Sequence, residues 1–231
     1  MIRAILFNAF FWPGFVGYLA IMYPFTYFAN QKQVCRFVYR KVTRWMLFCL
    51  RVFSGIKHEV VGIDKLKKQL EHGPVIIGCN HQSAWETFVF SLFFEELTVV
   101  AKKELFKLPI AGIYFDRLKC IPVDRTSVVS AIKSLIKHGK IALENRQSIV
   151  IFPNGTRGLS SEKAEYKSGI FALYKTLGIP VVPCYVNSGE FWPRRAFKKK
   201  KGTIILEFKD VILPGLDKES FMSTFEERQA I

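Results

Sequence analysis

After residue 57, short apolar runs alternate with longer stretches in which apolar residues recur at helical spacing. Uninterrupted apolar runs, such as residues 75–77 and 149–152, are typical of strands that are buried on both faces. Strands that alternate with helices predict an α/β fold, with a mostly parallel sheet covered by helices. We expect strands at 58–63, 75–77, 97–101, 119–123, 148–152, 179–186 and 203–208, with a possible extension at 211–213. We expect helices at 64–72, 87–95, 127–144, 169–177 and 218–229.

The first 57 residues have a different pattern. No charged residue lies between Ala4 and Asn30, a length that exceeds the roughly 20 helical residues needed to span a bilayer core. Pro13 and Pro24 interrupt this run, so a spanning helix and a re-entrant or interfacial helical hairpin both remain open. A secretory signal peptide fits less well, because the apolar run is too long and has no clear cleavage site. We therefore divide the chain into membrane-anchoring helices at 1–57 and a globular domain at 58–231.

A basic stripe follows the uncharged run. Its members are spaced four, four and seven residues apart, which places them on one side of a helix: Arg36, Arg40, Arg44 and Arg51. This spacing predicts a basic amphipathic helix that lies among lipid headgroups, with its arginines on phosphates. The alternative is a helix of the soluble core with a solvated basic edge.

Composition strengthens the membrane interpretation. Half of the 231 residues are apolar, yet 34 Lys and Arg against 19 Asp and Glu give a net charge of +15. A protein that rests on an anionic lipid surface is expected to be both apolar and basic, whereas nucleic-acid binders are rarely so apolar. The five cysteines are scattered, which indicates reduced thiols in a cytosolic environment, with neither a disulfide framework nor a zinc site.

The candidate chemistry begins at the turn after the 75–77 run. His81 lies between a strand end and a helix start, where α/β folds place functional residues, and Ser83 can cap the helix. Glu86 is in the first turn of that helix, so its carboxylate can fold back onto the imidazole. A histidine oriented by a carboxylate is a general base. Taken by itself, the pair is more often a turn histidine beside an acid that favours the helix dipole.

Cationic residues follow three other predicted strands: Lys102, Arg125 and Arg157. The carboxyl ends of parallel strands lie along one edge of a sheet, so these cations can converge with His81. Arg157 comes after Asn154-Gly155, a dipeptide suited to a tight turn with exposed N–H groups. A guanidinium at such a turn can grip a phosphate through paired hydrogen bonds.

Together these segments resemble the sequence blocks of the glycerolipid acyltransferases, and more narrowly the PlsC-like family of 1-acyl-sn-glycerol-3-phosphate acyltransferases. The resemblance covers about residues 60–193. The matching segments are Asn80–Glu86, Ala101–Leu105, Gly112–Arg125, Phe152–Arg157 and Val181–Pro183. Two positions depart from the family pattern, because Glu86 replaces the commoner Asp and Asn154 replaces the usual Glu. The first change keeps the carboxylate, whereas the second keeps the turn and loses a charge.

The resemblance implies an acyltransferase domain at 58–231 that moves a fatty acyl group from a thioester to the sn-2 hydroxyl of lysophosphatidic acid. The product is phosphatidic acid, for phospholipid synthesis. The expected donor is acyl carrier protein or coenzyme A thioester, with no metal or redox cofactor. The expected location is the cytoplasmic face of the bacterial inner membrane, in contact with membrane phospholipids.

The site residues implied are His81 as general base and Glu86 as the group that orients it. The phosphate-binding residues are Lys102, Arg125 and Arg157, and the substrate-binding loop is Asn154, Gly155 and Thr156. Two alternatives remain: an acyltransferase for another lipid acceptor, such as a lipid A precursor or an ornithine-type lipid, and a non-catalytic membrane protein that binds anionic lipids. A hydrolase that uses Ser83 lacks the usual Gly-x-Ser-x-Gly elbow.

Overall fold

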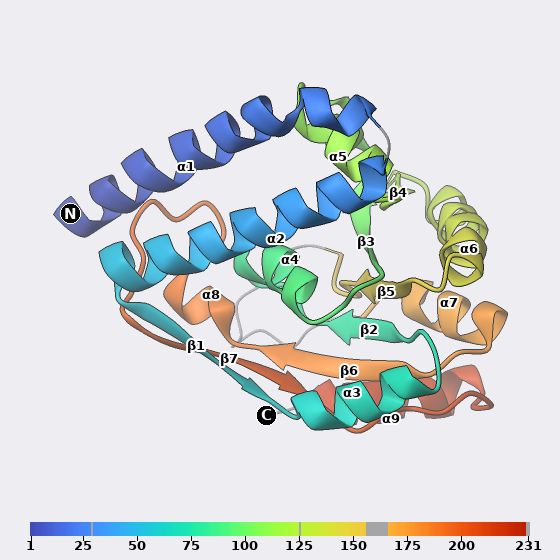
Figure 1. The fold of residues 1–231 in the computed structure, drawn as a ribbon. Coiled ribbons are helices and arrows are strands. Elements are labelled where there is room, and N and C mark those ends of the chain that lie inside the picture. Colours follow the sequence, from blue (N-terminus) through green and yellow to red (C-terminus); the bar gives the residue numbers. More distant parts are fainter. Residues whose placement is uncertain (29, 125, 156–165, 230–231) are drawn as a thin grey trace.

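A mostly parallel β-sheet forms the centre of the molecule (Figure 1). The computed structural model describes residues 1–28, 30–124, 126–155 and 166–229. Within these residues the sheet has seven strands in the order β1-β7-β6-β2-β5-β3-β4. The strands are β1 Ile56–Val61, β2 Ile76–Cys79, β3 Leu97–Lys102, β4 Ile121–Val123, β5 Ser148–Ile151, β6 Val181–Val186 and β7 Gly202–Phe208.

The pairing confirms the predicted sheet. Every neighbouring pair is parallel except β6 and β7, which are antiparallel. The run at 211–213 contributes only a bridge between Val181 and Ile212, and so is not a further strand. Since β2, β5 and β3 are adjacent and parallel, their carboxyl ends reach the same edge of the sheet, as predicted.

Helices cover both faces of the sheet (Figure 1). They are α1 Ile2–Met22, α2 Gln31–Cys49, α3 Ile63–Glu71, α4 Trp85–Val89, α5 Ala111–Arg117, α6 Val128–Glu144, α7 Gly169–Leu177, α8 Ser188–Phe191 and α9 Lys218–Gln229. Alternating residues of β2 face opposite sides: Ile77 packs in the cluster with α1, α2 and α4, and Ile76 packs with α6, α7 and α9. This explains why the strand reads as an unbroken apolar run.

Several helical segments differ from the sequence-based prediction, among them α4, α5 and α8. The predicted helix at 87–95 is the short α4 followed by a 3₁₀ turn, Phe90–Leu92. Helix α5 was not predicted, because its segment reads as an apolar turn. The hydroxyl of Tyr114 in α5 donates a hydrogen bond to the carbonyl of Leu19 in α1 (2.8 Å). The partner of α5 is therefore 95 residues away in the chain, where no local pattern can reveal it.

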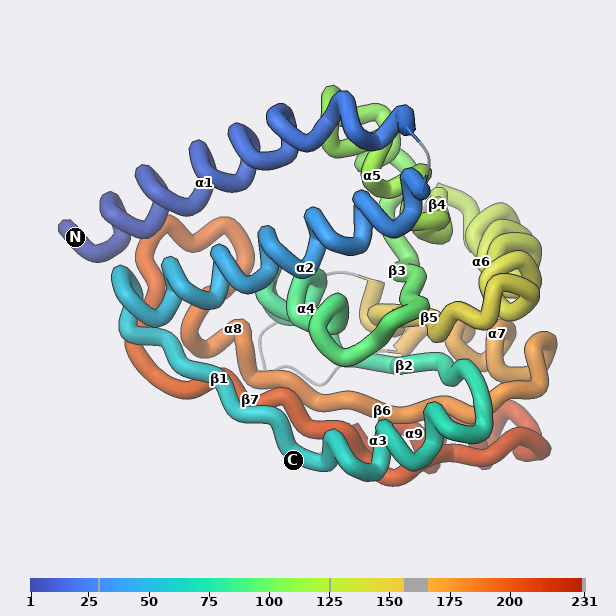
Figure 2. Tube along the Cα trace, in the orientation of Figure 1, coloured from blue at the N-terminus to red at the C-terminus, as the bar shows by residue number. Residues whose placement is uncertain are grey.

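The N-terminal segment forms a helical hairpin in which the uncharged run supplies α1 and the basic segment supplies α2. The two helices run antiparallel and are joined by the 3₁₀ turn Pro24–Tyr27 (Figures 1 and 2). The expected break at Pro13 is absent, because α1 continues through it to Met22. A Cβ atom on Gly14 would lie 2.7 Å from Nε1 of Trp45. Glycine thus permits the two helices to approach closely at this point.

Helix α1 has two apolar faces with different surroundings. Phe7 and Phe11 are fully buried against Trp192, and Nζ of Lys199 lies 4.2 Å from the centre of the Phe7 ring. The opposite face exposes Ile2, Ile5, Leu6, Phe10, Trp12, Val16 and Ile21. Among the described helices, α1 is the one long and apolar enough to cross a membrane. An exposed apolar face of this kind is suited to lipid contact.

Two arginines of the predicted lipid-facing stripe, Arg36 and Arg40, bind protein groups instead. Arg36 pairs with Glu96 and donates to the carbonyl of Glu95 (2.8 Å). Arg40 donates to two further carbonyls, of Ser91 (3.0 Å) and Phe94 (2.8 Å). These two arginines therefore hold the loop before β3, whereas Arg44 and Arg51, which follows the end of α2, are exposed. The residues before β3 leave carbonyl groups without strand partners, and the guanidinium groups satisfy them.

Truncation of Phe11 tests how strongly α1 is docked. Phe11→Ala removes a fully buried ring and should destabilise the folded protein by about 3–5 kcal/mol. Val16→Ala in the same helix truncates a side chain that is 53% exposed, and should change stability by less than about 0.5 kcal/mol. Denaturant unfolding of the detergent-solubilised protein measures both. Equal effects of the two variants would contradict the docked arrangement of α1.

Candidate active site

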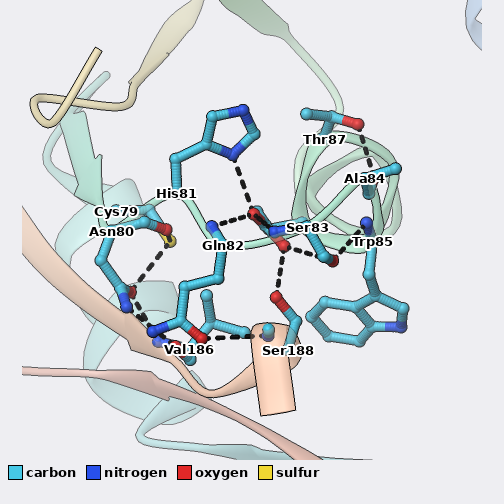
Figure 3. A network of polar contacts seen from close by, with 12 residues as sticks. Cys79, Asn80, His81, Gln82, Ser83, Ala84, Trp85, Thr87, Val186 and Ser188 are labelled. Atoms are coloured by element: carbon cyan, nitrogen blue, oxygen red, sulfur yellow. Dashed lines mark hydrogen bonds and ion pairs between the residues drawn. The ribbon is translucent and has the colours of Figure 1, made fainter. Parts of the chain in front are cut away.

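The turn between β2 and α4 carries the candidate catalytic pair (Figure 3). Strand β2 ends at Cys79, and helix α4 begins at Trp85, whose N–H donates to Oγ of Ser83 (2.9 Å). The hydroxyl of Ser83 thus accepts from an N–H at the start of α4, but the N-cap residue is Ala84 and not Ser83 as predicted. The side chain of Asn80 bonds the backbone of Val186 in both directions, at 2.8 and 2.7 Å. These bonds fix where the turn leaves the sheet.

His81 and Glu86 are in direct contact, as their spacing predicted. Nδ1 of His81 lies 2.8 Å from Oε1 of Glu86. Glu86 is fully buried, and the His81 residue is 8% exposed. The five-residue separation would place the two side chains on different faces of a continuous helix, and the turn at 80–84 is what brings them together.

The carboxylate of Glu86 accepts several further hydrogen bonds. Oε1 accepts from the backbone N–H groups of Gln82 (2.7 Å) and Ser83 (2.6 Å). Oε2 accepts from the hydroxyls of Ser83 (3.0 Å) and Ser188 (2.6 Å). Burial is the largest single influence on the pKa of Glu86 and raises it. The bond and charge of His81, with the bonds from Ser188 and Ser83, outweigh burial and leave the pKa below its ordinary value. The group is therefore an ionised carboxylate.

An ionised carboxylate fixes the tautomer of His81. It can only accept hydrogen bonds, so Nδ1 of His81 carries the proton that it shares with Glu86. The basic lone pair is then on Nε2, the atom that takes a proton in general base catalysis. The arrangement can thus remove a proton from a hydroxyl group and stabilise the imidazolium that forms.

Phe152 is a site residue that was not singled out from the sequence. Its ring stacks on the imidazole of His81, with centres 4.4 Å apart. It directly follows β5, so it joins the third sequence block to the catalytic turn. Three residues further along the chain, Gly155 adopts φ +71°, and its N–H donates a hydrogen bond to the carbonyl of Phe152 (2.9 Å). The tight turn predicted at Asn154-Gly155 is therefore present beside His81.

A mostly apolar cavity of about 410 Å³ opens against His81. Its volume is in the range of ligand pockets. The walls come from the α1–α2 hairpin, α4, α5 and β3, and include Phe15, Leu19, Cys35, Val38, Phe88 and Tyr114. The N-terminal helices thus supply part of the wall of the site, besides any role at a membrane.

Among the residues that the structure describes, two cationic side chains line this cavity with His81. Lys102, a predicted site residue at the end of β3, lines it and pairs with Glu104 at 3.4 Å. Arg194 also lines it and was not predicted, because it lies in a long basic stretch with no distinguishing pattern. The predicted residues Arg125, Thr156 and Arg157 lie outside the described residues.

Comparison with known proteins identifies the family. A family model described as "Acyltransferase" matches residues 57–187, which is more than half of the chain. The chain belongs to the acyltransferase family. The matched region contains the candidate catalytic pair and ends one residue before Ser188.

Several named relatives resemble this acyltransferase. The 1-acyl-sn-glycerol-3-phosphate acyltransferase of Pseudomonas aeruginosa is 35% identical over 209 residues, covering 88% of this chain and 77% of that protein. The Helicobacter pylori protein of the same name is 27% identical over 195 residues, covering 82% and 77%. The crystal structure of the 1-acyl-sn-glycerophosphate (LPA) acyltransferase PlsC from Thermotoga maritima superposes with a TM-score of 0.75 at 20% identity. It covers 98% of this chain and 91% of that chain, and confirms the fold.

The charge state of Glu86 predicts a pH dependence of stability. Because folding lowers its pKa below the ordinary value of 4.5, the folded state favours the ionised form. This contribution is present above about pH 4.5 and is lost as the pH falls through the lower pKa of the folded state. The stability of the wild-type acyltransferase relative to Glu86→Gln should therefore decrease on acidification below about pH 4.5. Thermal unfolding of both proteins across pH measures this difference, and an increase would refute an ionised Glu86.

Proposed function

We propose that this acyltransferase moves a fatty acyl group from an acyl thioester to the sn-2 hydroxyl of lysophosphatidic acid, forming phosphatidic acid. The observation that carries the proposal is the hydrogen-bonded His81–Glu86 pair at the mouth of an apolar cavity that two cations share. A lysophosphatidic acid molecule offers the matching parts: a hydroxyl, an anionic phosphate and a fatty chain. The names of the relatives in Pseudomonas aeruginosa and Helicobacter pylori support this choice of acceptor.

In the proposed reaction His81 acts directly on the acceptor. Nε2 takes the proton of the hydroxyl as its oxygen attacks the thioester carbonyl, with no acyl-enzyme intermediate. The new C–O bond forms, the C–S bond breaks, and the departing thiolate takes the proton back from the imidazolium. Glu86 keeps Nδ1 protonated throughout and offsets the transient positive charge. The protein needs no cofactor besides the donor in this scheme.

We propose that Lys102, Arg125 and Arg157 bind the phosphate of the acceptor. The substrate-binding loop in this proposal is Asn154, Gly155 and Thr156. Lys102 lines the same cavity as His81, which supports its place in this group. The other two arginines are assigned from the family blocks. Arg194 adds a further cation at the cavity and suits the phosphate of either substrate.

The apolar cavity is suited to a fatty acyl chain, since its walls are mostly hydrocarbon and it ends against His81. The donor is expected to be acyl carrier protein or coenzyme A thioester. Both donors are anionic, and the basic stretch of residues 194–201, which contains Arg194, favours such partners through charge complementarity.

We place the enzyme at the membrane, on the cytoplasmic face of the bacterial inner membrane. Helix α1 supports contact with membrane phospholipids, because it is long, apolar and exposed on one face. The acceptor and the product are themselves membrane lipids. A site walled by the same helix would receive and release them without passage through water.

Mass spectrometry of membranes containing the protein, given lysophosphatidic acid and each thioester, tests the function. Phosphatidic acid should form. His81→Ala and Glu86→Gln should each slow transfer by about 10²- to 10⁴-fold, because the first removes the base and the second removes the carboxylate that holds the base in its correct tautomer. His72→Ala removes an exposed histidine of the α3–β2 connection, and should leave the rate unchanged. Transfer to a lipid A precursor or an ornithine-type lipid in place of lysophosphatidic acid would refute lysophosphatidic acid as the acceptor. Binding to anionic vesicles without thioester cleavage would refute the proposed enzymatic activity.

Arg157→Ala tests the assignment of the phosphate. The variant should raise KM for lysophosphatidic acid about tenfold or more with a smaller change in kcat, because a charge-assisted hydrogen bond is lost in ground state and transition state alike. Arg146→Ala, at the opposite end of β5, is the matched control and should leave KM unchanged. Steady-state kinetics with varied acceptor decide the point. An unchanged KM in Arg157→Ala would remove its assigned role.

A further inference from the structure

The buried carboxylate of Glu86 receives one hydrogen bond from a distant part of the chain. Its partners His81, Gln82 and Ser83 are neighbours in the same turn, whereas Ser188 is 102 residues away. Oε1 accepts from the three local N–H groups, and Oε2 accepts from the hydroxyls of Ser83 and Ser188. The Ser188 bond is the shorter of the two at Oε2, 2.6 Å against 3.0 Å.

Ser188 is held firmly in this position. It is the first residue of α8, is separated from the end of β6 by Asn187, and is fully buried. Flanking residues bond the catalytic turn as well: Val186 exchanges two hydrogen bonds with Asn80, and the N–H of Gly189 donates to Oε1 of Gln82 (3.0 Å). Figure 3 shows the Ser188 hydroxyl pointing toward the turn from the side opposite His81. The segment 186–189 thus fixes the turn at residues 80–84 through hydrogen bonds from a different part of the chain.

The hydroxyl of Ser188 affects the orientation of the Glu86 carboxylate. The last torsion of a Glu side chain is broad, so the plane of its carboxylate is set by its hydrogen bonds. A bond on Oε2 from the side opposite the imidazole fixes that plane and keeps Oε1 directed at Nδ1 of His81. The hydroxyl also helps to satisfy a fully buried ionised group, which would otherwise be costly.

We propose that Ser188 is a positioning residue, which sets the orientation of Glu86 and through it the orientation of His81. Its importance for turnover rests on the proposed function, whereas its effect on the His81–Glu86 hydrogen bond does not. Ser188 itself lies outside the region matched by the acyltransferase family model, which ends at residue 187.

The variant Ser188→Ala is compared with Ser91→Ala. Ser91 is also a buried serine, and its hydroxyl lies 2.9 Å from that of Thr43, away from Glu86. With lysophosphatidic acid, Ser188→Ala should lower kcat about 10- to 100-fold, by analogy with the loss of outer hydrogen-bond partners around metal-ligating histidines, with KM unchanged. Ser91→Ala should leave both constants unchanged.

A second readout needs no substrate. The Nδ1 proton of His81, shared with a carboxylate, should give a downfield proton NMR signal that is assigned by its loss in His81→Ala. Ser188→Ala should shift or broaden this signal, and Ser91→Ala should leave it in place. An unshifted signal in folded Ser188→Ala would overturn the proposal.

The two readouts separate the two hypotheses. A wild-type protein that transfers no acyl group to lysophosphatidic acid would refute the proposed function, and the NMR signal would still decide on Ser188. If Ser188→Ala fails to fold, Ser188→Cys keeps a similar volume with a weaker donor. The same shift is then expected in that variant, and an unchanged signal would overturn the proposal.

Discussion

The site depends on one buried ionised carboxylate. Glu86 has no exposed surface, and a charge in that position is tolerated only when protein donors replace its lost hydration. Those donors are two backbone N–H groups, two hydroxyls and the imidazole of His81. The requirement explains the shape of the turn, because residues 82 and 83 must direct their N–H groups inward. It also explains the tautomer of His81, since the carboxylate can only accept.

The sheet makes this arrangement possible by its strand order. Strand β2 lies between β5 and β6, so the turn that follows β2 has a neighbour on each side. On the β5 side, Phe152 stacks on His81. On the β6 side, Ser188 and Gly189 bond Glu86 and Gln82. A catalytic turn at an edge strand would have such support on one side only.

The N-terminal hairpin contributes to the same site through its buried face. Phe7 and Phe11 pack in one cluster with the sheet, while Leu19 and Cys35 line the cavity beside His81. The outward face of α1 is apolar and exposed. One helix therefore presents apolar surface to the surroundings on one side and to the cavity on the other, which suits the proposed lipid acceptor. The hairpin and the sheet are parts of one packed structure.

The sequence by itself determined the features that arise from local pattern. Apolar runs indicated the strands of a mostly parallel sheet, and the spacing of His81 and Glu86 indicated a pair joined across a turn. The uncharged run indicated an apolar N-terminal segment suited to a membrane and left a spanning helix and a hairpin both open. Only the tertiary structure decided the rest: the bond from Ser188 to Glu86, the stacking of Phe152 on His81, the place of Arg194 at the cavity and the carbonyl partners of Arg36 and Arg40. Periodicity records which face of an element is buried, but it contains no information about which distant element covers that face. That choice depends on strand order and helix packing, which are set by the whole chain at once.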